Sequence, residues 1–252
     1  MTKIQEVTVT KHYLFDVDGT LTPSREKIDE EFHSFLVEFF TNNNCSIVTG
    51  SDIDKTIEQL GEQLLGLTIF NFNCSGNSIT GKQEYHSDWT PSDELIDYLN
   101  QLCHTSNFTK KAGNHIEKRT GSLNFSIVGR PANKYERELY VKHDNYHNER
   151  KRLSSLINAK FTDIMAVVGG ETGLDIFEKN KDKRQVLEYI GEDESIFFYG
   201  DMMEEGGNDY SLMDEIRKKE RGISYHVRGW QQTYELLDHG TTAETVLDCF
   251  KR

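Results

Sequence analysis

Two aspartates two residues apart offer the first chemistry in this chain. Asp16 and Asp18 stand in the stretch LFDVDGTLTPSR, directly after an apolar run and, for Asp18, directly before Gly19. Side chains at positions i and i+2 of an extended chain point to the same side, so the two carboxylates are expected close together. Like charges at that separation are unfavourable unless a cation lies between them. The pair therefore indicates either a bound metal ion or carboxylates that react themselves.

Further polar side chains follow apolar runs later in the chain. The hydroxyls of Thr49 and Ser51 come after CSIV, Lys183 opens a helical pattern, and Asp201 follows IFFYG. Ligands of an open parallel sheet bind at the carboxyl ends of its strands. We therefore expect these side chains to meet Asp16 at one edge of a sheet. Asp209, in the later GGND stretch, either stabilises its loop or contacts the ligands of a bound metal without binding the metal itself.

The apolar patterns between these residues predict the elements that position them. Strands are expected over residues 5–16 and 45–52, helices over 27–40 and 52–65, and a strand with a turn over 68–80. This βαβαβ order predicts a parallel sheet covered by helices.

The middle of the chain has a different pattern. A helix is expected at 92–104, a hairpin at 115–130, a helix near 145–158 and two strands within 161–179. The α/β pattern resumes at about residue 186 with a helix at its start and two more strands. We therefore predict an α/β fold whose doubly wound, Rossmann-like parallel-sheet core is discontinuous. The expected boundaries are 1–82 and 186–252 for the core and 83–185 for an inserted α+β cap.

Composition and charge narrow the class of protein. The chain has 252 residues and a net charge of −13, which disfavours generic binding to nucleic acid or to anionic membranes. Residues 105–155 nevertheless hold eleven Lys and Arg against five Asp and Glu, which indicates either an anion-binding segment or a solvated basic face. No apolar run reaches the length of about 20 residues that a membrane helix needs. Four scattered cysteines are typical of free thiols in a reducing compartment, so a cytoplasmic protein is expected.

FDVDGTLT, the hydroxyl turn, the lysine and GD…GND, in this order, resemble the four motifs of the haloacid dehalogenase superfamily of phosphotransferases. The resemblance implies that Asp16 is a nucleophile that forms an aspartyl phosphate and that Asp18 is the general acid and base. It further implies that Mg²⁺ is held by Asp16, the backbone carbonyl of Asp18 and Asp201, and that Lys183 neutralises the phosphate. A hydroxyl of Thr49 or Ser51 would bind phosphate oxygens, and Ser51 is the preferred candidate.

Several segments also resemble eukaryotic-type phosphomannomutases, among them SDIDKTIEQLG, IEKRTGSLNFSIVGR and GGETGLDIFEKNKDKRQVL. The resemblance runs over nearly the whole chain. It implies a second phosphate site and sugar contacts, which match Arg25, Arg119, Arg130, Arg137, Gly173 and Asp175. Arginine suits that task because its planar fork matches phosphate oxygens. Gly173 departs from the family, which tends to have serine there, so one hydrogen bond to the substrate is expected to be missing.

The resemblance implies a mutase that interconverts mannose 6-phosphate and mannose 1-phosphate and so feeds GDP-mannose synthesis. A hexose 1,6-bisphosphate would serve as activator, and a homodimer through the cap is a further expectation. Two other interpretations remain open: a capped sugar-phosphate phosphatase of the same superfamily, and a binding or regulatory protein without turnover. The first differs in admitting water to the aspartyl phosphate, and the second is disfavoured by the intact carboxylates and lysine.

Overall fold

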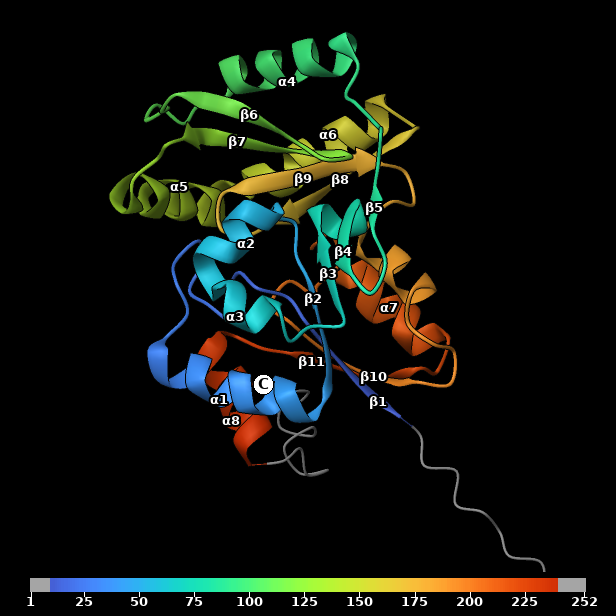
Figure 1. Ribbon diagram of the computed structural model, residues 1–252. Helices are drawn as coiled ribbons and strands as arrows, with labels where there is room; N and C mark the ends of the chain where they lie inside the picture. Colours follow the sequence, from blue (N-terminus) through green and yellow to red (C-terminus); the bar gives the residue numbers. More distant parts are fainter. Residues whose placement is uncertain (1–9, 240–252) are drawn as a thin grey trace, which may run out of the picture.

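The larger of two sheets in the structure, a computed structural model that describes residues 10–239, has seven strands in the order β11-β10-β1-β2-β3-β4-β5 (Figure 1). The strands from β11 to β3 pair in parallel, whereas β4 and β5 pair antiparallel at one edge. The bounds are β1 Lys11–Phe15, β2 Asn44–Val48, β3 Phe70–Asn73, β4 Ser78–Gly81, β5 Tyr85–His86, β10 Ser195–Gly200 and β11 Gly222–His226.

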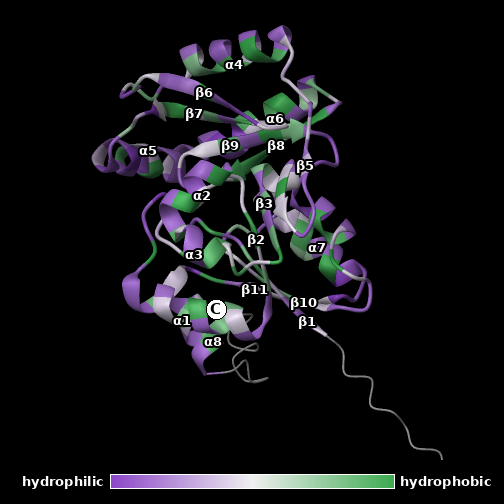
Figure 2. Cartoon of the chain, in the orientation of Figure 1, coloured by the Kyte–Doolittle hydropathy of each residue, from purple (hydrophilic) through white to green (hydrophobic). Residues whose placement is uncertain are grey.

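Helices cover both faces of this sheet, which makes it doubly wound as predicted. On one face, α1 (Glu30–Asn42), α2 (Ile53–Leu60), α3 (Glu62–Leu65) and α8 (Trp230–Asp238) share an apolar cluster with the strands. On the other face, the 3₁₀ helix η2 (Lys183–Glu188) and α7 (Tyr210–Lys218) pack against a second cluster. Figure 2 shows hydrophobic and hydrophilic residues side by side along α7, as expected for a helix with one buried face.

The smaller sheet is antiparallel, with the order β6-β7-β9-β8, and we call it with its helices the cap. Its elements are α4 Asp93–Thr105, β6 Asn114–Arg119, β7 Ser122–Arg130, α5 Lys134–His147, α6 Glu149–Lys160, β8 Ile164–Gly169 and β9 Gly173–Glu178. Alternation along β7 separates its two faces, as the two-residue period of a strand requires. Leu123, Phe125 and Ile127 join the apolar cluster with the helices, and the polar Asn124 between them lines a pocket on the other face.

Several predicted elements differ in the structure. The expected helix 52–65 is two helices, because Gly61 between them has φ +81° and ψ 154°, a conformation open mainly to glycine. The helix expected near 145–158 corresponds to α6, whereas α5, which ends one residue before Asn148, was not predicted. The helix expected after Asp182 is the 3₁₀ helix η2. The first part of the strand expected over 5–16 lies outside the described residues, and β1 begins at Lys11.

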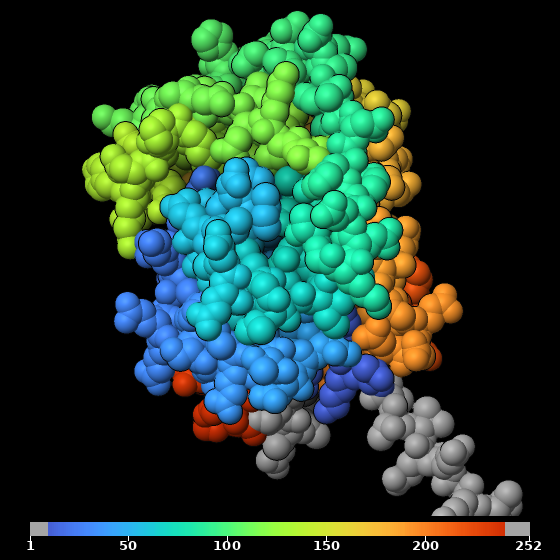
Figure 3. Space-filling view, viewed as in Figure 1, coloured from blue at the N-terminus to red at the C-terminus, as the bar shows by residue number. Residues whose placement is uncertain are grey.

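Backbone contacts join the cap to a loop of the core, and Figure 3 shows the cap residues lying directly against α2. The loop that precedes α7 forms a parallel bridge with the edge strand β8, between Gly207 and Val168. The Val168 N–H donates to Gly206 O at 2.9 Å, and the Asn208 N–H donates to Val168 O at 3.0 Å. The exact limits of core and cap, at 82/83 and 185/186, stay predictions; β5 pairs within the larger sheet.

Candidate active site

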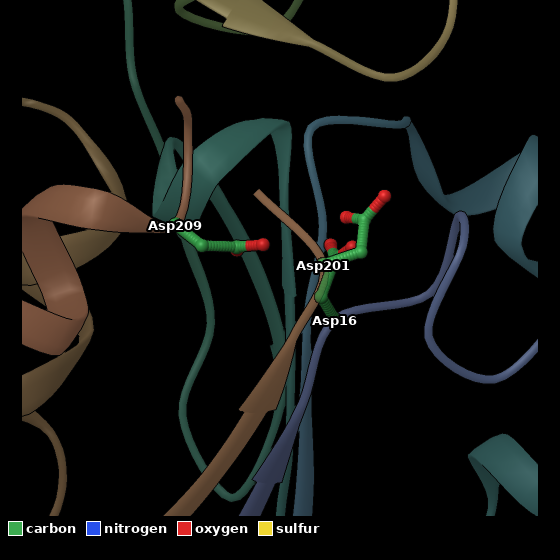
Figure 4. Close-up of side chains that lie close together, drawn as sticks. All are labelled: Asp16, Asp201 and Asp209. Atoms are coloured by element: carbon green, nitrogen blue, oxygen red, sulfur yellow. The ribbon is translucent and has the colours of Figure 1, made fainter. Parts of the chain in front are cut away.

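Three carboxylates meet where the central strands of the larger sheet end. Asp16 follows β1 and Asp201 follows β10, and these two strands are neighbours in parallel register. Asp209 comes from the loop before α7, and Figure 4 shows its side chain pointing toward the other two. One carboxylate oxygen from each of the three lies within 4.8 Å of the others. The sequence therefore brings Asp16 and Asp201 together as predicted, and the structure adds Asp209 to them.

Lys183 lies behind this carboxylate cluster and is fully buried. Its Nζ donates to Asp16 Oδ1 at 2.6 Å and to Asp209 Oδ1 at 2.7 Å. Burial alone would lower the pKa of Lys183, but the charges of Asp16 and Asp209 outweigh it and raise the pKa. The side chain is therefore a permanent cation that fixes the Asp16 carboxylate from one side.

The electrostatics of the cluster call for one more cation. Burial raises the pKa of Asp16 to about 8, and the charge of Asp209 adds to it although Lys183 opposes. Burial and the charges of Asp16 and Asp209 likewise raise the pKa of Asp201. Carboxylate oxygens and water are the ligands that Mg²⁺ prefers, so this donor set fits a magnesium ion. Asp16 and Asp201 are the side chains that would hold it, with the backbone carbonyl of Asp18 as a candidate ligand.

Asp18 is held in place by two donors. The Arg25 N–H donates to Asp18 Oδ1 at 2.5 Å, and Gln59 Nε2 donates to the same oxygen at 3.0 Å. Gln59 Nε2 also lies 3.0 Å from Thr22 Oγ1, so one buried amide links the Asp18 turn to α2. Sequence reasoning missed Gln59, although a glutamine in the apolar pattern of a helix is the kind of signal that marks a buried polar contact.

Gly19 allows the Asp16–Asp18 turn to approach the opposite strand end. Its φ is +80°, and a Cβ atom at this position would lie 2.8 Å from Cγ of Asp201. Any side chain would therefore push the two carboxylate-bearing segments apart.

Thr49 and Ser51 both line the pocket in front of the carboxylates. Thr49 Oγ1 accepts from the Ser51 N–H at 3.1 Å. The N-cap of α2 is Asp52, whose Oδ1 accepts from the Lys55 N–H, so the Ser51 hydroxyl does not cap this helix. Which of the two hydroxyls binds phosphate stays a prediction, with Ser51 preferred.

Cap residues close the pocket opposite the carboxylates. Its walls include Arg25, Arg119, Arg130, Gly173 and Asp175 from the predicted set, together with Asn124. Predicted positions more than 150 residues apart in sequence therefore share one cavity. Arg137 lies at the rim, where its Nη1 donates to the Ser24 carbonyl at 3.4 Å.

Arg130 carries a positive charge that the surrounding residues do not fully balance. Burial and the neighbouring Arg25 lower the pKa of Arg130 to about 10. Its Nε is buried without a hydrogen-bond partner among the described residues, and an oxygen of Glu117 lies 3.6 Å from it. Nη2 donates to Asn124 Oδ1 at 2.8 Å. A buried guanidinium with an unused donor is suited to an anion.

Arg119 connects the cap with the loop after β2. Its Nη1 donates to the Gly50 carbonyl at 2.6 Å, while Glu117 Oε1 accepts from its Nε at 2.8 Å. Asp175 Oδ1 lies 3.6 Å from Arg119 Nη1. A Cβ on Gly50 would lie 2.6 Å from Asp175 Oδ2, so the cap carboxylate rests directly on a core glycine.

Gly173 leaves room for Asn124. A Cβ at Gly173 would lie 2.5 Å from Asn124 Nδ2, and that amide donates to Asp175 Oδ1 at 2.9 Å. Asn124 therefore holds both Asp175 and Arg130, and sequence reasoning missed it because Asp175 lies on another strand, β9, 51 positions along the chain. The alternating pattern of β7, with one polar residue between Leu123 and Phe125, was the available signal.

Comparisons with known proteins agree on the fold. The IMP-bound, N-terminally truncated IMP-nucleotidase of Plasmodium falciparum superposes with a TM-score of 0.62 at 19% identity, covering 91% of this chain and 67% of that one. The C-terminal domain of the trehalose-6-phosphate phosphatase of C. albicans gives 0.59 at 13% identity, covering 92% and 91%. This chain therefore has the fold of the haloacid dehalogenase-like proteins.

Sequence comparison narrows this class. The model of the eukaryotic phosphomannomutase family matches residues 32–240. Phosphomannomutase of Oryza sativa subsp. japonica is 32% identical over an alignment of 234 residues, which covers 88% of this chain and 92% of the relative. Phosphomannomutase of Saccharomyces cerevisiae is 32% identical over an alignment of 244 residues, which covers 89% and 91%. The chain belongs to the eukaryotic phosphomannomutase family.

Proposed function

We propose that this protein interconverts mannose 6-phosphate and mannose 1-phosphate. A mutase needs one site where phosphorus reacts and a second that holds the other phosphate. The largely buried guanidinium of Arg130, whose Nε has no hydrogen-bond partner among the described residues and which lines the same pocket as Asp16, is the observation that carries this proposal. A phosphatase that acts on a single phosphate has no need for a second cation site of this kind. Family membership supports the same conclusion.

The chemistry follows from the roles that the family resemblance gives to Asp16 and Asp18. Phospho-Asp16 passes its phosphoryl group to a hydroxyl of the bound hexose phosphate, and Asp18 takes the proton of that hydroxyl. The bisphosphate then reorients in the pocket, so that its other phosphate faces Asp16. Asp16 then attacks the other phosphorus through the carboxylate oxygen that Lys183 does not hold, and Asp18 returns its proton to the departing oxygen. A bound Mg²⁺ would supply charge neutralisation for the transferred group.

The cap arginines hold the phosphate that does not react. Arg119 and Arg130 bind it in the pocket, with Arg25 and Arg137 beside them, and Asp175 accepts from sugar hydroxyls. Cap closure excludes water, which would otherwise hydrolyse phospho-Asp16. A hexose 1,6-bisphosphate primes the enzyme, and the product feeds GDP-mannose synthesis. We further propose, from the family resemblance, a cytoplasmic homodimer that associates through the cap. The described part of the chain contains no helix long and apolar enough to cross a membrane.

The first test is ³¹P NMR of the purified protein with Mg²⁺, mannose 1-phosphate and a trace of glucose 1,6-bisphosphate. Mannose 6-phosphate should appear while inorganic phosphate stays low. Growth of inorganic phosphate instead would identify a sugar phosphatase, and no reaction at all would favour a binding protein. The Asp16→Asn variant should lose turnover, and retained turnover would refute the nucleophile.

A further inference from the structure

Arg137 forms an ion pair with Glu171, a carboxylate that does not pair with Arg119 or Arg130. Its Nη1 lies 3.5 Å from Oε2 of Glu171, a residue in the turn between β8 and β9. The Arg137 side chain is 13% exposed and that of Glu171 is 48% exposed. Glu171 also lines the pocket, so this ion pair stands at its mouth.

The other carboxylates near the arginines are built into the cap sheet. Glu117 is on β6, where it accepts from Arg119, and Asp175 is on β9 and buried, where it accepts from Asn124. These two groups are fixed by strand backbone and by hydrogen bonds. Glu171 differs because it lies in a turn with about half of its side chain in water. Among the described residues near the arginines, it is therefore the acidic group most easily displaced.

A phosphate that reaches Arg137 must meet this carboxylate. The phosphate and the Glu171 carboxylate are both anions, and both bind the Arg137 guanidinium. The Arg137–Glu171 ion pair is partly solvated, so breaking it costs little free energy. The repulsion between a carboxylate and a phosphate dianion at one guanidinium adds to that cost.

We propose that Glu171 is a positioning residue of the second phosphate site, which holds Arg137 while the pocket is empty and competes with the incoming phosphate for it. The inference rests on the proposed function for the identity of the ligand, a hexose phosphate. It assigns to Glu171 a role in setting affinity: the site binds its ligand less tightly than the arginines alone would allow.

The test is a binding measurement on Glu171→Gln. Isothermal titration with mannose 1-phosphate is made in an Asp16→Asn background, so that the ligand stays unreacted. The Kd should fall about two- to fivefold, the factor that corresponds to a partly exposed ion pair. In the enzyme with Asp16 intact, KM should fall by a similar factor. An unchanged or raised Kd would overturn the proposal.

Two further variants make the result specific. Glu26 pairs with Lys134 at 3.2 Å, in an exposed contact that also joins core and cap but does not line the pocket. Glu26→Gln should leave the Kd unchanged, whereas an equal gain would point to net charge alone. In an Arg137→Ala background, Glu171→Gln should no longer improve binding, because the competition acts through Arg137. A gain that persists there would also refute the mechanism.

Failure of the proposed function is distinguishable from failure of this inference. If the wild type binds mannose 1-phosphate without converting it, the mutase proposal fails while the Kd comparison still decides the role of Glu171. If the wild type converts it and the Glu171→Gln Kd equals that of its parent, only the inference fails.

Discussion

Gln59 illustrates how a residue with no reactive group can serve the chemistry. Its side chain is buried within α2, where an amide costs free energy unless it is hydrogen-bonded. The amide nitrogen reduces that cost by donating to Asp18 and to Thr22, whereas the amide oxygen has no hydrogen-bond partner among the described residues. Asp18 is therefore oriented by a group 41 positions away in the chain.

We expect Gln59→Leu to lower kcat roughly tenfold with little change in KM for mannose 1-phosphate, since an acid–base group that is free to rotate spends less time in position. Steady-state kinetics of the purified variant check this. Thr22→Val is the matched control, because it removes one other partner of Gln59 Nε2 and leaves the contacts with Asp18 and with the Glu26 carbonyl in place. A control that loses as much activity as Gln59→Leu would show that the network acts only through stability.

At the scale of residues, the sequence predicts the site residues that follow strands better than the residues that hold those side chains in place. Asp16 and Asp201 end neighbouring parallel strands, and that arrangement follows from the α/β pattern alone. Asn124 and Gln59 depend on which distant strand or helix lies opposite, and local periodicity carries no such information. The role of Asp209 stayed open for the same reason, since its contact with Lys183 joins residues 26 apart.

At the scale of elements, Gly61 ends one helix and begins the next. Replacing it by alanine would force a side-chain-bearing residue into φ +81° and ψ 154°, which costs about 1–3 kcal/mol. A Cβ there would meet nothing closer than His33 Nε2 at 3.9 Å, so the cost is conformational and not steric. Urea unfolding of Gly61→Ala measures it.

Gly66, at the other end of α3, is the control for this substitution. Its φ of −68° and ψ of −15° suit any residue, so Gly66→Ala should change the free energy of unfolding by less than about 0.5 kcal/mol. Equal losses in both variants would contradict the conformational explanation.

His12 makes the stability of strand β1 depend on pH. Its Nδ1 lies 2.9 Å from Glu194 Oε2 and its Nε2 2.9 Å from Ser46 Oγ. Burial lowers the pKa of His12 against the opposing effect of Glu194, while the charges of Arg221 and Lys82 lower it further. The unfolded chain, with a histidine pKa of about 6.5, therefore binds the proton first.

The contribution of His12 to stability is complete above about pH 6.5 and is lost as the pH falls toward the lowered pKa of the folded state. We expect the urea midpoint of the wild type to drop between pH 7.5 and 5.5 by more than that of His12→Gln, which cannot titrate. Parallel declines in the two proteins would show that other groups cause the loss.

Helix α5 shows why some helices cannot be predicted from the spacing of apolar residues. Only Tyr140 and Asp144 of its fourteen residues are buried, so no apolar stripe marks it. Its start is fixed by a capping box, in which Asn133 accepts from the Glu136 N–H and Glu136 accepts from the Asn133 N–H. An Asn three residues before a Glu was the readable signal.

At the scale of the whole molecule, core and cap meet through main-chain groups as well as side chains. The Val168 and Asn208 amides both donate across the boundary, so opening of the cap, which the proposed function requires, would break these hydrogen bonds. Their exchange with solvent deuterium therefore reports cap opening.

Ligand that binds the closed form should slow exchange at Val168 and Asn208. With Mg²⁺ and glucose 1,6-bisphosphate at ten times its Kd, the open population should fall about tenfold. Amide exchange followed by NMR tests this, with Phe198 in the centre of β10 as a reference that stays slow in both states. Unchanged exchange at both amides would mean that the cap opens without breaking this bridge.

The bridge between Val168 and Gly207 also bears on how such proteins can be recombined. The loop from Asp201 to Asp209 takes part of its shape from an edge strand that belongs to the cap. A chimaera that keeps every core side chain but receives a foreign cap would lose these hydrogen bonds, unless the edge strand of the new cap places its backbone groups where Val168 places them here. We therefore expect a cap to be exchangeable only together with this loop, although the two segments are separate in the sequence.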